Sequence, residues 1–274
     1  MNSSVTNSTA YVFDMRLINA AVACVVTIQV INISIGLPLN CYIIKLLLSK
    51  GGGGVDVSVV FALNHAAAEI IYCFVAPLYI VCIISIDLCV GPLLGLWIGT
   101  CMPARYLFQC WVCVERYMAV IHPVTFLRFK PLRYRVACSA SAWACALAMG
   151  ITSMFTFPGL PYAPFGLLYL FIFLLDSLCC VSILNGLLRP GPGDREKDEM
   201  NAAKKKAFKI VCLNLLTFLI QTIPIVCSFG LDGVLAPDHF FLAVAIGMTI
   251  NIGAGFIHPI FVLYKAGKLT FLKC

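Results

Sequence analysis

The protein has 274 residues, of which 61% are hydrophobic and only 11% are charged, and its mean hydropathy is +0.98. Soluble globular proteins carry about 25% charged residues, so this composition excludes an ordinary soluble domain and indicates an integral membrane protein. The formal net charge of +7 does not call for a nucleic-acid partner, because basic residues gathered at one membrane face produce such a charge by themselves.

Seven long apolar stretches follow one another along the chain. A helix needs about 20 mostly apolar residues to cross roughly 30 Å of hydrocarbon, and backbone amides in lipid must be hydrogen-bonded within the segment, which favours helices. The alternating pattern of a membrane barrel is absent. We therefore predict an all-α membrane protein, a seven-transmembrane helix bundle, with helices near residues 17–49, 57–86, 91–121, 135–157, 164–188, 207–230 and 240–264.

Lysine and arginine indicate the orientation of this bundle. Of the 19 basic residues, all but Arg16 and Arg105 lie in or beside segments on one side of a seven-helix path, and the positive-inside rule places that side in the cytoplasm. The N-terminus is then extracellular. We expect an extracellular tail (1–16), a seven-helix domain (17–264) and a short cytoplasmic tail that forms an amphipathic helix (265–274), in a multi-pass protein of the plasma membrane.

Short patterns at the two ends agree with this topology. Asn2 and Asn7 begin Asn-x-Ser/Thr sequons on the expected extracellular tail, which predicts N-glycosylation there. Cys274 ends the short basic tail behind Phe271 and Leu272, and an S-acyl anchor would fit this position.

Motifs for catalysis, metal binding or phosphate binding are missing from the sequence. It has no Gly-rich phosphate loop, no H-E-x-x-H pair and no Ser/His/Asp set outside the apolar stretches, so we expect neither an enzyme nor a bound cofactor or metal. The long polar run at 189–209 is predicted to form the third inner loop and a cytoplasmic extension of the sixth helix. Its lysines at 204–206 would contact either lipid phosphates or a cytosolic partner.

Ionisable residues inside the predicted helices each cost roughly 2.5–3.5 kcal/mol on insertion scales, so we expect them to be paired or functional. Arg105 precedes Arg116 by eleven residues, about 16 Å along a helix axis, which places it near the middle of the membrane. Asp176 is either a ligand anchor or a hydrogen-bond acceptor between helices, and His65 either packs against neighbouring helices or senses protons. The full set is Glu69, Arg105, Asp176, His65 and His258.

Short motifs also follow one another in a fixed order through these helices: GLPLN at 36–40, LNHAAAE at 63–69, ERYMAVIHP at 115–123, Trp143, Pro224 and HPIFV at 258–262. In this order and spacing the chain resembles the rhodopsin-like (class A) G-protein-coupled receptors over roughly residues 20–270. GLPLN and ERYMAVIHPV are most similar to the branch that holds purinergic nucleotide and protease-activated receptors, in particular its orphan fish members. The resemblance implies that signature positions are occupied by Asn40, Glu69, Arg116, Trp143, Pro224 and Pro259.

The resemblance implies an activation switch made of Glu115, Arg116 and Tyr117 together with Pro224 and Pro259. Arg116 would be held by its neighbour Glu115 at rest and released when the sixth helix swings outward, which exposes a cavity for the terminal helix of a heterotrimeric G protein. The alternative is an interfacial charge pair that merely marks the membrane edge. Because Lys204 stands where an acidic partner is often found, Glu115 alone would hold Arg116, and we expect basal activity.

The polar core departs from the family pattern. It consists of Asn40, Glu69, Arg105 and His258, with Glu69 for the usual Asp, Arg105 for a small polar residue and His258 for the usual Asn. A sodium ion normally sits there in this family. We expect Arg105 to pair with Glu69 and to replace the ion; the alternative is that Arg105 binds backbone carbonyls or water elsewhere.

The ligand pocket implied by the resemblance contains Ile98, Asp176, Thr222 and Ile252. Ile98 occupies the position of the aspartate in amine receptors, and Ile252 occupies that of the lysine in opsins. Thr222 occupies a position where the family commonly has a tryptophan. Three aspartates give the outer mouth a mildly acidic character, which weakly favours a peptide, cationic or lipid ligand: Asp87, Asp232 and Asp238.

Different functions remain compatible with these patterns. The first is a receptor whose partners are an extracellular ligand, a heterotrimeric G protein and membrane lipids, with no nucleic acid. The second is a non-signalling seven-helix decoy or a scaffold that partners another receptor, which the altered positions Thr222 and His258 favour. A transporter or channel is disfavoured, because no internal repeat is visible.

Overall fold

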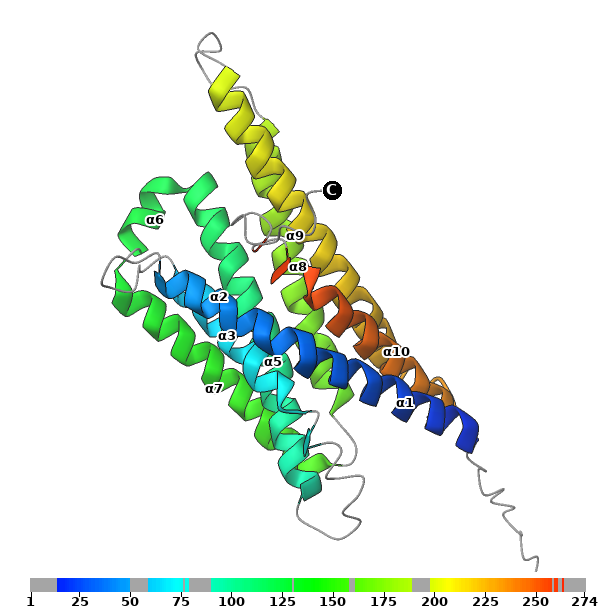
Figure 1. Cartoon of the computed structure of the whole chain (residues 1–274). Helices are drawn as coiled ribbons and strands as arrows, with labels where there is room; N and C mark the ends of the chain where they lie inside the picture. Colours follow the sequence, from blue (N-terminus) through cyan, green and yellow to red (C-terminus); the bar gives the residue numbers. More distant parts are fainter. Residues whose placement is uncertain are drawn as a thin grey trace, which may run out of the picture.

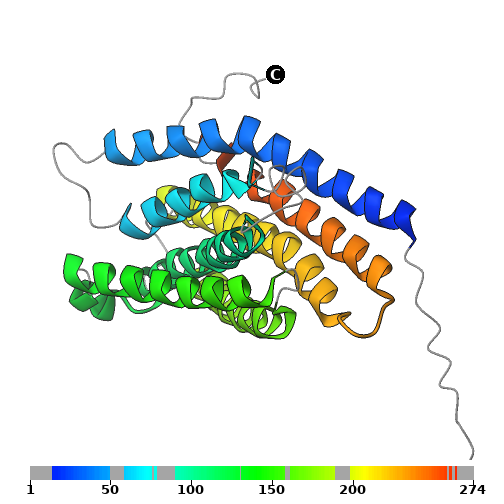
Figure 2. The ribbon, with the colours of Figure 1, turned by 90° about the horizontal axis from the view of Figure 1, so that it is seen from below.

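The computed structural model describes residues 14–49, 59–75, 77–78, 90–129, 131–157, 161–188, 198–257, 259–260 and 263, and this part of the chain is all-helical, without strands. Figures 1 and 2 show the long helices packed side by side as a bundle. In chain order the elements are α1 (Met15–Ile31), the π-helical stretch η1 (Asn32–Gly36), α2 (Leu37–Ser49), α3 (Val60–Cys73), α5 (Val90–Ile121), α6 (Pro123–Phe129), α7 (Leu132–Thr156), α8 (Tyr162–Leu188), α9 (Asp198–Gly230) and α10 (Pro237–Gly255).

Each of the seven predicted stretches contains helix, although residues 79–86 of the second stretch and the last residues of the seventh lie largely outside the described ranges. The first is covered by α1, η1 and α2, which run without a break, and the others by α3, α5, α7, α8, α9 and α10 in order. The predicted extension of the sixth stretch is present, because α9 already begins at Asp198; it projects beyond the other helices in Figure 1. The sequence did not predict α6, which begins at Pro123, although proline suits the first turn of a helix.

The surface of the bundle carries long apolar stripes. On α8, Leu167, Phe171 and Leu178 are each more than 60% exposed, and their spacing of four and seven residues places them on one face. Such a face is unfavourable in water and suits hydrocarbon. Within the described residues, four helical stretches are long and apolar enough to cross a membrane: Met15–Ser49, Leu132–Thr156, Tyr162–Gly186 and Pro237–Gly255.

A proline accounts for the π-helical stretch inside the first long helix. Pro38 has no N–H and its ring would clash with the carbonyl of Ser34, four residues earlier. The backbone widens there, and the Leu37 N–H donates to the carbonyl of Asn32, five residues earlier. The Asn32 side chain is buried and lies close to Gly36, where a Cβ would fall 2.5 Å from its Oδ1.

Close backbone contact joins α5 to α7. A Cβ at Gly95 would lie 2.7 Å from the Ser153 carbonyl oxygen, and a Cβ at Gly150 would lie 2.7 Å from the Leu96 carbonyl oxygen. Only glycine leaves room for backbones at this distance, which is how small residues pack helices in membranes. The contact fixes the axis of α5, the helix that carries most of the polar side chains described below.

The centre of the bundle is aromatic. The ring centroids of Tyr106 and Tyr169 are 4.5 Å apart, and those of Tyr169 and Phe229 are 6.0 Å apart. These contacts join α5, α8 and α9 with rings that are all nearly fully buried. The polar side chains of α5 are thereby held at defined positions along the inside of the bundle.

Candidate functional site

The predicted ion pair between Glu69 and Arg105 is present. Arg105 Nε on α5 donates to Glu69 Oε1 on α3 at 2.7 Å. Only 5% of the Arg105 side chain and 12% of the Glu69 side chain are exposed. A buried guanidinium without an acid would leave an uncompensated charge, so this contact explains how an apolar helix accommodates an arginine near its middle.

Further polar groups surround the pair and connect it to α1. The Arg105 guanidinium carbon lies 4.3 Å from the centroid of the Tyr72 ring, and Gln29 Nε2 donates to the Tyr72 hydroxyl at 3.2 Å. His65 Nδ1 lies 3.2 Å from the Arg105 carbonyl oxygen, and its Nε2 lies 3.9 Å from Glu69 Oε1. His65 therefore packs against the ion pair, which is the first of the two predicted alternatives.

Uncharged polar groups form a second junction, between α5, α9 and α10. Asn251 Nδ2 donates both to the Tyr106 hydroxyl and to the Gln221 carbonyl oxygen, the latter at 2.9 Å. Gln109 Nε2 donates to Gln221 Oε1 at 3.3 Å. Pro224 lies in the same turn of α9 and removes the N–H that would otherwise bond the Ile220 carbonyl, and the neighbouring Gln221 carbonyl accepts a side chain from α10.

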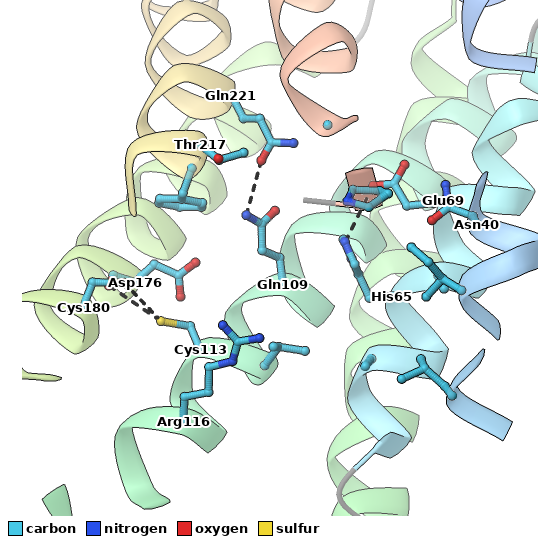
Figure 3. A pocket seen from close by; sticks show the side chains of 18 of the residues that line it. Asn40, His65, Glu69, Gln109, Cys113, Arg116, Asp176, Cys180, Thr217 and Gln221 are labelled. Atoms are coloured by element: carbon cyan, nitrogen blue, oxygen red, sulfur yellow. Dashed lines mark hydrogen bonds and ion pairs between the residues drawn. The ribbon is translucent and has the colours of Figure 1, made fainter. Parts of the chain in front are cut away.

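A cavity of about 200 Å³ lies among α2, α3, α5, α8, α9 and the end of α10. Figure 3 shows its lining, which extends from Gln221 on α9 to Arg116 on α5 and includes Glu69. Asn40, assigned by sequence to the polar core, also lines the cavity, and its Nδ2 donates to the Gly36 carbonyl oxygen at 2.9 Å. The cavity thus links the polar core to the Glu-Arg-Tyr motif.

The expected pairing of Glu115 with Arg116 is wrong. Glu115 Oε1 lies instead 2.5 Å from Nη2 of Arg135, on the first turn of α7. The Arg135 guanidinium is buried, 5.9 Å from the ring of Phe61 and 5.8 Å from that of Phe126. Neighbouring residues on a helix point about 100° apart, so Glu115 faces α7 while Arg116 turns to the other side.

Arg116 points into the cavity, as Figure 3 shows. Within the described part of the chain, its guanidinium makes no ion pair and no hydrogen bond. The side chain is partly buried, so the charge lies in the wall of the cavity and is partly shielded from solvent. This position makes Arg116 available to a group that enters the cavity.

The other predicted switch residues lie around this site. The Tyr117 hydroxyl lies 3.2 Å from His122 Nε2, and its side chain packs against the cluster of Cys180 and Ile183. Tyr117 therefore packs near the C-terminal end of α5 and does not line the cavity. Pro259 lines the cavity. Pro224 lies inside α9, three residues after Gln221, which lines the cavity.

Of the four predicted ligand-pocket residues, Asp176 alone lines the cavity among the described residues. Asp176 lines the cavity, and Figure 3 shows its carboxylate turned toward it; Oδ1 has no hydrogen-bond partner among the described residues. Ile98, Thr222 and Ile252 belong to the packed interior and do not line the cavity. The cavity therefore lies on the Arg116 side of the bundle and not where a ligand pocket was expected.

Several predictions fall on residues outside the described ranges, namely those on His258, Asn2, Asn7, Cys274 and Asp87. Asp232 is exposed, as the expected acidic mouth requires, whereas Asp238 is buried. It is 2% exposed, and its Oδ2 accepts the Asp14 backbone N–H at 3.1 Å. Asp238 thus ties α10 to the start of α1, and its Oδ1 lies 3.1 Å from His239 Nδ1.

The roles of Gln221, Asn251 and Tyr106 were not predicted from the sequence, because the prediction of the polar core started from side chains that can carry a charge near neutral pH. Uncharged polar side chains within the apolar stretches were the signal that could have identified these residues, since each polar group also needs a hydrogen-bond partner in lipid. Arg135 was missed for another reason, because it lies near a basic inner segment where an arginine needs no explanation. No family model matches the sequence.

Proposed function

We propose that the protein is a rhodopsin-like G-protein-coupled receptor of the plasma membrane, which passes an extracellular signal to heterotrimeric G proteins. One observation carries the proposal: the Arg116 guanidinium, which has no ion pair or hydrogen bond among the described residues, faces a cavity enclosed by several helices, at the end of the helix that bears the Glu-Arg-Tyr motif. The order of helical segments and motifs along the sequence supports the same assignment.

The proposed topology has seven spans, an extracellular N-terminus and a cytoplasmic C-terminus. Arg116 lies beside basic segments that the positive-inside rule assigns to the cytoplasm, so the cavity would face the inner side. A cytosolic partner could then reach it. A membrane location is supported by the four described helical stretches that are long and apolar enough to cross a bilayer and by the exposed stripe of α8, and the proposed orientation rests on the distribution of lysine and arginine.

The proposed mechanism is a widening of this cavity. An outward swing of α9, bent at Pro224, would separate it from α5 and α8 and admit the terminal helix of a G protein. The last carbonyls of a helix carry partial negative charge and lack partners, and Arg116 would donate to them. Because Glu115 is engaged by Arg135, we expect a weakly restrained resting state with measurable basal activity.

The proposed role of the polar core is to hold α3 and α5 together with a built-in cation. The Arg105 guanidinium lies where the resemblance implies a sodium ion, and Glu69 already accepts from it. We therefore propose that signalling does not depend on sodium. The extracellular ligand would bind at the opposite end, with a peptide, a cationic molecule or a lipid favoured weakly by composition.

A scaffold or decoy is the second candidate. Thr222 is fully buried in the interior of α9, where the family commonly carries a tryptophan ring in the pocket. A helix without this ring lacks one usual means of sensing a ligand. A protein of this kind would reach the surface and bind a partner receptor without activating a G protein.

A cell assay distinguishes the two candidates. We expect the wild-type protein to activate at least one G-protein class without added ligand, and Arg116→Ala to abolish this activation at matched surface expression. Arg133→Ala is the control, because Arg133 is exposed on α7 beside Tyr134 and away from the cavity. Good surface expression without activation of any class, with or without a broad ligand screen, would favour the scaffold.

A further inference from the structure

Two thiols meet in the wall of the cavity. Cys113 on α5 and Cys180 on α8 have their sulfur atoms 3.5 Å apart, and both residues line the cavity. Figure 3 shows Cys113 directed at α8, with Arg116 one turn further along α5. The contact thus bridges the two helices immediately beside the arginine of the proposed switch.

The environment of the two sulfurs differs in accessibility. Cys113 is partly exposed, whereas Cys180 is 5% exposed and packs against Ile183 and Tyr117. A small polar oxidant that enters the cavity would therefore reach Cys113 first. Cys180 is held close behind it, in the position of a resolving thiol.

Little movement is needed to join the two sulfurs. A disulfide bond is about 2.05 Å long, so the sulfurs would approach by about 1.5 Å from their present separation. Rotation of two cysteine side chains with a small adjustment between α5 and α8 supplies such a displacement. Both helices are continuous through these positions, so the new bond would connect two rigid elements.

We propose that Cys113 and Cys180 form a reversible modification site, at which hydrogen peroxide converts the two thiols into a disulfide that cross-links α5 to α8. The Cys113 sulfur attacks peroxide, the O–O bond breaks, and the products are a sulfenic acid and one water molecule. The Cys180 sulfur then attacks the sulfenic sulfur, so that an S–S bond forms and a second water leaves. The two sulfurs are oxidised and one peroxide molecule is reduced to two waters.

The location suits a transient bond, and this part of the inference rests on the proposed function and topology. On the cytoplasmic side, the glutathione and thioredoxin systems keep thiols reduced, and disulfides there are typically transient and redox-sensing. A link one turn from Arg116 would hold α8 against α5. It would fix the two helices that form the cavity wall beside Arg116, so they could not adjust to an entering G-protein helix, and oxidation should lower basal activation.

The bond itself can be tested without any signalling assay. A protease site is inserted at 158–160, between α7 and α8, so that cleavage separates Cys113 from Cys180 onto different fragments. Membranes are treated with hydrogen peroxide, free thiols are blocked with N-ethylmaleimide, and the cleaved protein is run on a non-reducing gel. We expect the fragments to stay linked in the wild type and to separate after treatment with dithiothreitol.

Serine variants identify the sulfurs involved. The Cys179 thiol also interacts with the Cys113 thiol, so it is the competing partner that the variants must separate from Cys180. Cys113→Ser and Cys180→Ser should each lose the link, whereas Cys179→Ser and the control Cys227→Ser, at an exposed position of α9, should retain it. Surface expression of each variant shows that it has folded. Wild-type fragments that separate at every peroxide concentration would overturn the proposal, and so would a link that persists in Cys113→Ser or is lost in Cys179→Ser.

The signalling consequence has a separate readout. In cells, peroxide should reduce the basal activation of the wild type and leave that of Cys113→Ser unchanged. If the link forms on the gel and no G protein is ever activated, the modification site stands and the proposed receptor function fails. If signalling is present and the fragments never link, the modification site alone is refuted.

Discussion

Residue by residue, the strongest constraint in this molecule is the ion pair of Glu69 and Arg105. Each charge alone would cost roughly 2.5–3.5 kcal/mol inside a bilayer, and loss of one partner from a buried pair typically costs ~3–5 kcal/mol. The 2.7 Å contact and the Tyr72 ring beside the guanidinium together compensate the arginine. The pair is thus a requirement for inserting α3 and α5 side by side.

Neutral substitutions of either member should therefore harm the protein. We expect Arg105→Leu and Glu69→Leu each to lower surface expression strongly, since each leaves one buried charge without a partner. The reciprocal double variant Glu69→Arg/Arg105→Glu should restore part of the loss. Surface expression by flow cytometry measures this, with Arg128→Leu as the control, because Arg128 is exposed on α6.

A wild-type level of surface expression in Arg105→Leu would contradict this account of the pair. Equal losses in the two single variants and the double variant would also contradict it, because a specific contact between the two side chains predicts rescue.

The residue scale also shows what sequence can and cannot provide. The ion pair of Glu69 and Arg105 could be predicted, because few charged side chains lie within the predicted membrane helices and the depth of each along a helix axis is easily calculated. The partner of Glu115 could not be matched, because Arg135 reaches it from the next long helix, and the packing of α5 on α7 decides that contact. Adjacency in the chain suggested Arg116, which faces elsewhere.

At the scale of elements, the contact of α5 with α7 depends on glycine. Carbonyl oxygens of one helix lie 2.7 Å from where a Cβ of the other would be, at both Gly95 and Gly150. These atoms belong to the backbone and cannot rotate away as a side chain could. Any larger residue must push the helix axes apart and displace the polar groups that α5 presents.

Alanine at these positions should therefore destabilise the protein although alanine favours helices. Gly150→Ala and Gly95→Ala each gain about 1 kcal/mol of helix propensity and lose about 1–3 kcal/mol through overpacking, so we expect a lower melting temperature in detergent. Gly253→Ala is the matched control, because nothing lies within 4 Å of a Cβ there. It should melt at the wild-type temperature or above it.

Melting temperatures for Gly150→Ala and Gly95→Ala that equal or exceed that of Gly253→Ala would show that α5 and α7 do not approach so closely.

Helix positions were largely predictable, because apolar runs of sufficient length leave few alternatives in lipid. The start of α9 at Asp198 agreed with its helix-compatible polar sequence. The π-helical stretch before Pro38 was not predicted, since the response of a backbone to proline depends on neighbouring groups, here the buried Asn32 side chain. The position of the cavity also could not be predicted from the sequence, because it results from several helices packing together.

At the scale of the whole molecule, the arrangement is a bundle whose packed interior opens into a cavity beside Arg116. The polar core ties α1, α3 and α5, and the amide junction ties α5, α9 and α10. These two networks meet on α5, so a displacement of α9 would act on the helix that carries Arg116. The central claim is that this cavity, when widened, activates a G protein through Arg116.

Nucleotide exchange with purified components tests this claim most directly. The protein is reconstituted in lipid nanodiscs, and GTP-analogue binding is followed for purified G proteins of each class without added ligand. We predict that the wild type and Arg133→Ala accelerate exchange on at least one class, and that Arg116→Ala does not. Wild-type protein that accelerates exchange on none of them, or Arg116→Ala that accelerates it as well as the wild type, would contradict the account.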